Sequence, residues 1–138
     1  RLNKSSKYSK KNFLVCYGDT MVDIDLNKYI KFYLKKIKKT LVASYQLKSS
    51  FGILDIMKNN NVVDFREKPE LDIWFNVGYF MFSSDNFYLF KKFKKFQELL
   101  KFLSKKNLMR AYKHIGNHIT VNTVAELEIA KKHIKIFN

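Results

Sequence analysis

An aspartate directly after a short apolar run is the first residue of this sequence whose position suits chemistry. Residues 13–17, FLVCY, are typical of a buried strand, and Gly18-Asp19 ends that strand in a turn. In open α/β sheets, ligands bind beyond the carboxyl ends of the strands. A carboxylate there can hold Mg²⁺ against a nucleotide phosphate. Because Gly-Asp is also a common turn dipeptide, Asp19 is a candidate metal ligand that needs support from other residues.

A second group of candidates flanks the single proline. Glu67 and Lys68 precede Pro69, which ends a strand and fixes the backbone where both side chains leave the sheet. A carboxylate accepts hydrogen bonds from sugar hydroxyls, and an ammonium neutralises a phosphate as a compact point charge. Asn76 and Gly78 follow in an apolar run, where the amide can donate and accept and the glycine permits a bulge or a close ligand. On their own, Glu67 and Lys68 also suit a solvated strand end, and Asn76 a buried amide satisfied by backbone groups.

The hydrophobic pattern indicates the elements that must position these residues. Residues 26–37 carry apolar side chains at helical spacing, and Asp25 is placed to cap that helix. A tight hairpin turn is expected at residues 59–61, because three asparagines tolerate positive φ. The expected strands are residues 13–17, 40–46, 53–58, 62–67, 73–82, 108–114 and 118–121, and the later helices begin near residues 84, 96 and 123.

This order of elements, β-α-β-β-β-β-α-α-β-β-α, predicts the fold class. No repeat or Pro-rich linker divides the chain, so we expect one domain over residues 1–138. The predicted architecture is α/β: a three-layer α/β/α arrangement, Rossmann-like, around a mixed, mostly parallel sheet.

Charge and composition restrict the class of partner. The chain has 27 Lys and Arg against 12 Asp and Glu, a formal net charge of +15, and 46% hydrophobic residues that can form a core. Only three basic residues are Arg, although recognition of bases and phosphates in nucleic acids favours the guanidinium group. We expect most lysines on solvated faces, no specific nucleic acid as partner, and an attraction for anionic ligands such as phosphates.

Cysteine, histidine and hydropathy exclude several other classes. Cys16 is the only cysteine, so no intrachain disulfide forms, and its apolar neighbours predict a small buried thiol. His114, His118 and His133 lack metal-ligand spacing with it, and exposure is expected for the first two. No apolar stretch reaches the roughly 18 residues of a membrane-spanning helix, so we expect a cytoplasmic protein without a membrane partner.

Two patterns favour alternative functions. Asp23 and Asp25 match the D-x-D signature of metal-dependent glycosyltransferases, a related three-layer fold, although helix capping accounts for Asp25. The aromatic residues of 87–96 could stack on single-stranded nucleic acid, although their spacing favours the core side of a helix. A GT-A-like glycosyltransferase fragment and a non-catalytic basic module that binds nucleic acid or anionic surfaces are therefore kept as alternatives.

Taken in order, the segments of this chain resemble the sugar-phosphate nucleotidyltransferases, also called nucleotide-sugar pyrophosphorylases. The resemblance rests on GDT, SSFGILDI, EKP and N-x-G, and it extends to the segment AYKHIGNHITVNTVAELEIAKKHI. The FG step and LMRAYKHIG are most similar to the glucose-1-phosphate cytidylyltransferase branch. Guanylyltransferases that act on mannose- or heptose-type phosphates share nearly all of these landmarks.

The resemblance implies a reaction and a set of roles. A sugar 1-phosphate oxygen attacks the α-phosphorus of a nucleoside triphosphate and releases pyrophosphate, while Mg²⁺ and cationic side chains neutralise charge. By position, Asp19 corresponds to the metal-ligating aspartate, Glu67 to the acceptor for sugar hydroxyls, and Lys68 to the lysine that binds the sugar phosphate. The remaining positions of the sugar pocket correspond to Gly52, Asn76 and Gly78.

Two departures from the family pattern change what this chain is expected to do. Asn122 stands where most members carry a second metal-binding aspartate, and its amide brings no charge, so we expect weaker Mg²⁺ binding. The family's glycine-rich nucleotide loop, with its catalytic Arg and Lys, has no counterpart among four scattered glycines. We expect the catalytic residues upstream of Arg1, and this chain to be the C-terminal, sugar-phosphate-binding portion of the enzyme, as a truncated, split or degenerate copy. An apolar patch left where the absent part packs would favour a homo-oligomer.

Overall fold

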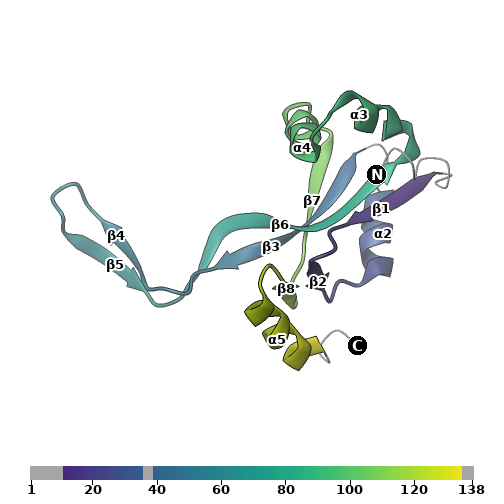
Figure 1. Cartoon of the computed structure of the whole chain (residues 1–138). Coiled ribbons are helices and arrows are strands. Elements are labelled where there is room, and N and C mark those ends of the chain that lie inside the picture. Colours follow the sequence, from purple (N-terminus) through teal and green to yellow (C-terminus); the bar gives the residue numbers. More distant parts are fainter. Residues whose placement is uncertain (1–10, 36–38, 135–138) are drawn as a thin grey trace.

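The computed structural model describes residues 11–35 and 39–134 (Figure 1). Its strands and helices follow the predicted order, with one additional short strand. In chain order the elements are β1 (Asn12–Cys16), β2 (Thr20–Val22), α2 (Leu26–Leu34), β3 (Thr40–Lys48), β4 (Ile53–Ile56), β5 (Val62–Arg66), β6 (Glu70–Ser83), the 3₁₀ turn η2 (Ser84–Asn86), α3 (Phe87–Lys92), α4 (Phe96–Lys105), β7 (Met109–Lys113), β8 (His118–Thr120) and α5 (Val124–His133).

A mixed sheet forms the centre of the body, with strand order β1-β6-β3-β7. β6 is antiparallel to both β1 and β3, and β3 is parallel to β7. Strands β1, β3 and β7 therefore share one direction, and β6 runs against them. The predicted mixed sheet is confirmed, but the expectation that it is mostly parallel is wrong, since only one of its three pairings is parallel.

Helices cover both faces of this sheet and complete the three layers (Figure 1). Alternate residues of β3 point to opposite faces: Leu41 and Ala43 belong to a core with α2, whereas Val42 belongs to a core with α3 and α4. The 3.6-residue periodicity of 26–34 buries Tyr29 and Tyr33 against the first face, and Asp25 caps the helix through the Lys28 amide as predicted.

Tyr29 anchors α2 to the sheet. Its side chain is fully buried, and its hydroxyl donates to the carbonyl oxygens of Leu41 at 3.1 Å and Tyr79 at 3.0 Å. One residue of the helix thus binds the backbones of two neighbouring strands. Burial raises the pKa of this phenol far above its usual range.

The second core is built largely from phenylalanine. Phe82 is fully buried, and its ring lies 4.9 Å from that of Phe90 and 5.5 Å from that of Phe13. Phe96 packs edge-on against Phe80 at 5.2 Å. The aromatic residues of 87–96 therefore include core residues, as their spacing predicts, and Tyr88 is their exposed exception.

Two smaller pieces extend from the body. The short strands β2 and β8 pair antiparallel next to α5, which begins with a capping box between Thr123 and Glu126. The hairpin of β4 and β5 projects far from the body (Figure 1); Asn60 in its turn has the positive φ of 67° that the asparagine run predicts. We call residues 51–66 the arm.

The structure corrects three further expectations and leaves two untested. β1 pairs only with β6 among the described residues, so it is an edge strand with alternate side chains exposed, and Cys16 is exposed instead of buried. Strand β2 was not predicted, because a three-residue run carries too little pattern. His114 is buried, not exposed. The expected ends of two helices, residues 36–37 and 135–137, lie outside the described residues. Within the described part, no helix is long and apolar enough to cross a membrane.

Candidate functional site

Strand direction places the predicted Asp19 and two further polar residues toward one edge of the sheet. β1, β3 and β7 run the same way, so their carboxyl ends meet at one edge, and the antiparallel β6 begins there. Asp19 follows β1, Lys48 ends β3, and His114 follows β7. This is the edge at which ligands bind in open α/β sheets.

Asp19 and Asn122 are brought to neighbouring positions by the pairing of β2 with β8. The Val121 amide donates to the Asp19 carbonyl at 2.8 Å, one step beyond the Thr20–Thr120 pair. The Asp19 carboxylate accepts a weak hydrogen bond from the Thr20 hydroxyl at 3.3 Å. The backbone amide of Asn122 is held by Glu126 at 2.6 Å.

The donor chemistry of this pair could serve a hard cation such as Mg²⁺. The pair offers one carboxylate and one amide oxygen, both of the hard oxygen type that Mg²⁺ prefers. Among the residues that the structure describes, no group of three His, Cys, Asp or Glu side chains could hold a metal. Two oxygen ligands would leave most of the Mg²⁺ coordination to other groups, such as waters or phosphate oxygens, which is how this ion usually binds in proteins.

Asn76 and Gly78 lie together on β6, against Tyr17. The Gly78 amide donates to Asn76 Oδ1 at 3.3 Å, and the Tyr17 amide donates to the Gly78 carbonyl at 2.8 Å. Gly78 has a φ of +75°, and a Cβ there would lie 2.6 Å from the Tyr17 ring. The close approach expected at this glycine is therefore made by an aromatic side chain of the protein itself.

Gly52, Glu67 and Lys68 form a separate group at the base of the arm. A Cβ on Gly52 would lie 2.6 Å from the Phe65 ring and 3.1 Å from Glu67 Oε2, so a larger residue would require these two side chains to shift. The Lys68 ammonium lies 4.0 Å from the Glu67 carboxylate, and Lys68 has a positive φ of 44°. Both charged side chains are more than 60% exposed, at 62% for Glu67 and 66% for Lys68, so they are open to a ligand.

The group of Gly52, Glu67 and Lys68 does not touch the pair of Asn76 and Gly78. Glu70, just after the Glu67 group, and Asn76 are six positions apart on β6, or about 20 Å at about 3.3 Å per residue. The structure therefore brings the predicted residues together within each group and leaves a span of sheet edge between the groups.

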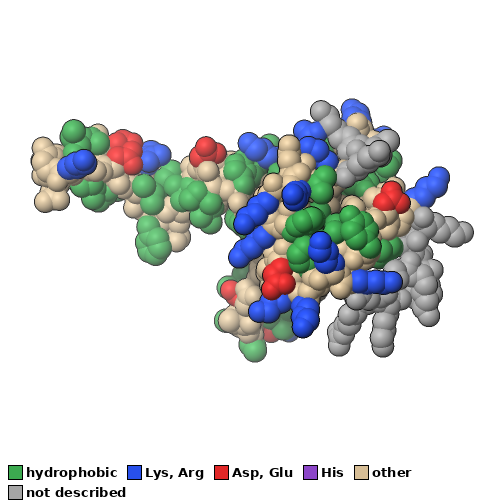
Figure 2. All heavy atoms as spheres, turned by 90° about the horizontal axis from the view of Figure 1, so that it is seen from above, with side chains coloured by type: hydrophobic (Ala, Val, Ile, Leu, Met, Phe, Trp, Pro, Cys, Tyr) green, Lys and Arg blue, Asp and Glu red, His purple; other side chains and the backbone are tan. Residues whose placement is uncertain are grey.

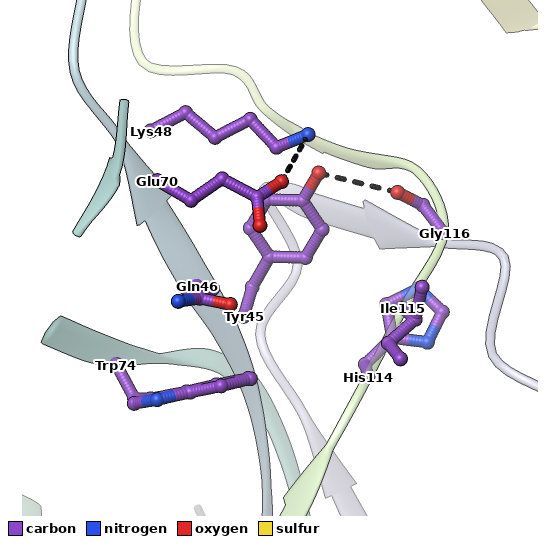
Figure 3. Close-up of a pocket in the computed structure, with 8 residues that line it drawn as sticks. All are labelled: Tyr45, Gln46, Lys48, Glu70, Trp74, His114, Ile115 and Gly116. Carbon is purple, nitrogen blue, oxygen red and sulfur yellow. Dashed lines mark hydrogen bonds and ion pairs between the residues drawn. The ribbon is translucent and has the colours of Figure 1, made fainter. Parts of the chain in front are cut away.

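A cleft lies along that span (Figure 3). It holds about 180 Å³. An ion pair of 2.8 Å joins Lys48 and Glu70 on its rim, and the Tyr45 hydroxyl donates to the Gly116 carbonyl at 3.2 Å. The Trp74 ring is held by the Lys113 ammonium, 4.5 Å from its centroid. The lining residues are Tyr45, Gln46, Lys48, Glu70, Trp74, His114, Ile115 and Gly116.

Comparison with known proteins identifies the family of the chain. The family model described as nucleotidyl transferase matches residues 2–123. The chain belongs to the nucleotidyl transferase family. It is 34% identical over 86 residues to a glucose-1-phosphate cytidylyltransferase of Salmonella typhimurium, a match that covers 60% of this chain and 33% of that protein. It is 28% identical over 149 residues to a glucose-1-phosphate adenylyltransferase of Mycoplasma mobile, covering 93% of this chain and 39% of that one.

Solved structures agree with the fold of this nucleotidyl transferase chain. A Bacillus anthracis structure assigned as a glucose-1-phosphate thymidylyltransferase, in complex with sucrose, superposes with a TM-score of 0.73 and 16% identity. The match covers 99% of this chain and 60% of that one. At this identity the likeness establishes the α/β fold. The chain spans a third to two fifths of the length of the curated relatives above.

A buried histidine that the sequence did not reveal braces the same edge of the nucleotidyl transferase sheet. His114 is only 6% exposed, and its Nε2 lies 2.8 Å from Asp23 Oδ1. Asp23 also accepts two hydrogen bonds of 2.7 Å from the backbone and side-chain amides of Asn117. Burial raises the pKa of the Asp23 carboxyl, but the hydrogen bonds from Asn117 and His114 outweigh it and hold that pKa below its ordinary value.

Both aspartates of the D-x-D pattern have structural roles within the chain. Asp23 joins the loop before α2 to the loop after β7, and Asp25 caps α2. Hydrogen bonds within the chain thus account for both carboxylates without a metal, and the motif match to glycosyltransferases is not supported. No spacing rule could have found this cluster, since His114 and Asp23 are separated by 91 residues.

His118 lies between aromatic rings beside the cleft. Its ring stacks 5.5 Å from Tyr45 and packs edge-on 5.3 Å from Phe75. Burial, and secondly the charge of His114, lower the pKa of His118 below its ordinary value. The fold therefore favours the neutral imidazole.

This pKa shift predicts that the domain loses thermal stability in mild acid. A histidine whose pKa is lower in the folded than in the unfolded state stabilises the fold fully above the unfolded value of about 6.5. That contribution is lost as the pH falls through the folded pKa. We expect Tm, followed by circular dichroism, to drop between about pH 7.5 and 5.5, and His118→Asn to flatten this drop. The exposed His133→Asn serves as control, and an equal flattening by both variants would contradict the assignment to His118.

Proposed function

We propose that the protein transfers a nucleotidyl group to a sugar 1-phosphate, which gives a nucleoside diphosphate sugar and pyrophosphate. In this proposal the present chain supplies the half of the site that holds the sugar phosphate and part of the metal site. The observation that carries it is the exposed Glu67–Lys68 pair packed beside Gly52, in a chain of this family. The curated relatives named for glucose 1-phosphate support the same substrate class.

Glu67 and Lys68 have complementary tasks in this proposal. The carboxylate accepts hydrogen bonds from sugar hydroxyls, and the ammonium neutralises the phosphate. Since these two side chains are 4.0 Å apart and largely exposed, they can turn to a ligand without breaking a buried ion pair. The aromatic and polar lining of the neighbouring cleft, with Tyr45 and Trp74, suits a small polar ligand.

Asp19 and Asn122 would hold the Mg²⁺ ion of this reaction. When bound, Mg²⁺ neutralises charge on the phosphates and orients them for in-line displacement. The single carboxylate predicts that binding needs the substrate phosphates as additional ligands. The chain's own residues would orient the sugar phosphate and neutralise its charge. The glycine-rich nucleotide loop typical of the family has no counterpart in this sequence. We therefore expect little turnover of nucleoside triphosphate by this chain alone.

Calorimetric titration tests the proposal. We expect glucose 1-phosphate to bind more tightly with Mg²⁺ than with EDTA, and at least about tenfold more tightly than glucose. A titration with single-stranded oligonucleotide tests the second candidate, a basic module favoured by the net charge of +15. Affinity for the oligonucleotide that falls steeply with salt, together with no binding of glucose 1-phosphate, would reject the sugar-phosphate site in favour of that module.

A further inference from the structure

Two aspartates lie at opposite ends of the ladder that β2 forms with β8. Asp19 precedes β2 and Asp23 follows it, with three residue pairs between them. At one end, the Val121 amide donates to the Asp19 carbonyl at 2.8 Å. At the other end, the Asp23 amide donates to the Asn117 carbonyl at 3.3 Å. The ladder thus joins the candidate metal ligands to the cluster around Asp23.

A ladder of this size does not fix its own position. Each of its strands has three residues, and an isolated two-stranded pair is only marginally stable in water. In the part of the chain that the structure describes, β2 and β8 pair only with each other. Val22 packs against the core beneath α2, but hydrophobic contacts of this kind are not directional. Directional contacts are therefore needed to hold the ends of the ladder in place.

Directional contacts of this kind meet at the Asp23 carboxylate. Its Oδ1 lies 2.8 Å from His114 Nε2 and accepts a hydrogen bond of 2.7 Å from the backbone amide of Asn117. Its Oδ2 accepts another of 2.7 Å from the Asn117 side chain. Because an ionised carboxylate can only accept, His114 Nε2 is the donor in the first contact. We call Asp23, His114 and Asn117 the brace, since they tie the residue after β2 to the residue before β8.

The brace is anchored to the central sheet through His114. The His114 amide donates to the Ser44 carbonyl at 2.8 Å, which continues the pairing of β3 with β7 by one residue. Tyr45, the next residue of β3, donates its hydroxyl to the Gly116 carbonyl at 3.2 Å (Figure 3). A continuous path of hydrogen bonds therefore runs from β3 through the brace to the ladder and its two candidate metal ligands.

Gly116 packs directly against the brace. A Cβ at this position would overlap Asp23 Oδ1 and would lie 2.8 Å from the His114 ring. A side chain at residue 116 would therefore displace the carboxylate while every hydrogen-bonding group of the brace stays in the chain. Gly116→Ala thus disturbs the brace in a way that is independent of removing Asp23.

We propose that the brace positions the metal site: it holds the ladder so that Asp19 and Asn122 keep the spacing that binds Mg²⁺ together with a sugar phosphate. This inference rests on the proposed function, which assigns Mg²⁺ to those two residues. Asp23 is a positioning residue, because it lies four positions from Asp19, or about 13 Å along the strand, and its oxygens are used within the brace. Mg²⁺ demands near-ideal octahedral geometry, so a small shift of one ligand weakens its binding.

Calorimetric titration of the full chain with glucose 1-phosphate, in Mg²⁺ and in EDTA, tests the proposal. Lysines are scattered over the body (Figure 2), and with a net charge of +15 they attract a phosphate in either buffer. The readout is therefore the ratio of the two affinities, which general attraction and general loss of structure leave unchanged. Outer residues that orient metal ligands contribute about ten- to a hundredfold to metal affinity. We expect Asp23→Ala and Gly116→Ala to lower the affinity in Mg²⁺ about tenfold and to bring the ratio close to one.

Two further variants separate positioning from charge and from stability. Asp25→Ala removes a carboxylate two positions away and, with it, the cap that accepts the Lys28 amide at 3.0 Å. Loss of a cap lowers stability, so this control should have a lower Tm and the wild-type ratio of affinities. Asp23→Asn keeps an acceptor for His114, and its own amide can donate to the Asn117 side chain once that amide turns over. We expect Asp23→Asn to retain the Mg²⁺ dependence that Asp23→Ala loses.

Amide hydrogen exchange reports the state of the ladder without any ligand. The Val121 amide is bonded to Asp19, so it should exchange at least about tenfold faster in Asp23→Ala than in the wild type. Amides in the pairing of β3 with β6 serve as the internal reference and should be unchanged. Asp25→Ala and Asp23→Asn should leave the Val121 amide as protected as in the wild type. If Asp23→Ala does not fold, Gly116→Ala carries the same comparison.

The outcomes distinguish this inference from the proposed function. A wild type that binds equally well in Mg²⁺ and in EDTA would reject the metal role in the proposed function, and this inference with it, before any variant is made. A Mg²⁺ advantage that survives in Asp23→Ala, or an unchanged Val121 amide, would overturn the inference and leave the proposed function standing. A loss in Asp23→Asn as large as in Asp23→Ala would also overturn it, because the charge of Asp23 would then act on the metal itself.

Discussion

Replacing Lys68 with alanine is expected to lower the affinity for glucose 1-phosphate about ten- to a hundredfold. Hydrogen bonds to charged groups contribute about 1.5 to 3 kcal/mol, and every 1.4 kcal/mol is a factor of ten in affinity. Lys68 has little to lose structurally, because its side chain is 66% exposed and its nearest charged neighbour, Glu67, is 4.0 Å away. The fold should therefore survive the change, and the loss should appear in calorimetric binding with no change in Tm.

A second lysine provides the control for this experiment. Lys58 lies in the turn at the far end of the arm and is also exposed. Lys58→Ala removes the same charge from the same hairpin at a distance from the candidate site, so it should leave glucose 1-phosphate binding unchanged. If both substitutions weakened binding equally, the attraction would be a general effect of the +15 charge, and the specific role of Lys68 would be wrong.

The secondary structure was largely predictable because local pattern and local chemistry agree. The helical spacing of Tyr29 and Tyr33 predicted which side of α2 faces the sheet, and both are buried. The asparagine run predicted a hairpin turn, and Asn60 has the required positive φ. In both places the determining forces act between residues fewer than five positions apart, which a sequence pattern records.

The features that escaped prediction depend on contacts between distant segments. The burial of His114 follows from Asp23, 91 residues away, and an edge position decides the exposure of Cys16. The projection of the arm was equally hidden, because the alternating pattern of residues 53–66 is the same for a hairpin packed on a body and for one without a partner. Pattern defines the faces of an element and does not identify what covers them.

The candidate site shows the same division. The β2–β8 ladder sets Asp19 opposite Val121, next to Asn122, so the two residues that the resemblance names as metal ligands lie near each other, and their role stays a prediction. The resemblance also grouped Gly52 with Glu67, and the structure shows the steric reason, since a side chain at residue 52 would meet the carboxylate and the Phe65 ring. The spatial gap between Asn76 and the group of Gly52 and Glu67, and the cleft within it, required the strand register of β6.

The substitution Phe82→Ala is expected to remove a large part of the domain's free energy of unfolding. Phe82 is fully buried and joins four elements: it pairs with Phe13 of β1, and its ring contacts Phe90 of α3 and Phe96 of α4. Truncating a buried phenylalanine costs about 3 to 5 kcal/mol, and a domain of this kind is stable by only about 5 to 15 kcal/mol. The urea midpoint is the free energy of unfolding divided by the slope of the transition, so it should fall in proportion to this loss, and a domain at the low end of the stability range should show no folded baseline.

The matched control separates this cavity effect from a general sensitivity of the aromatic segment. Tyr88 is 63% exposed on the same short helix as Phe90, so Tyr88→Ala should change the free energy of unfolding by less than about 0.5 kcal/mol. The contrast matters for the site, because β6 carries Asn76 and Gly78 on the same strand as Phe82. A core that holds this strand from α3 and α4 thereby fixes the position of the candidate ligand edge, and a tolerated Phe82→Ala would show that β6 is held by its strand pairings alone.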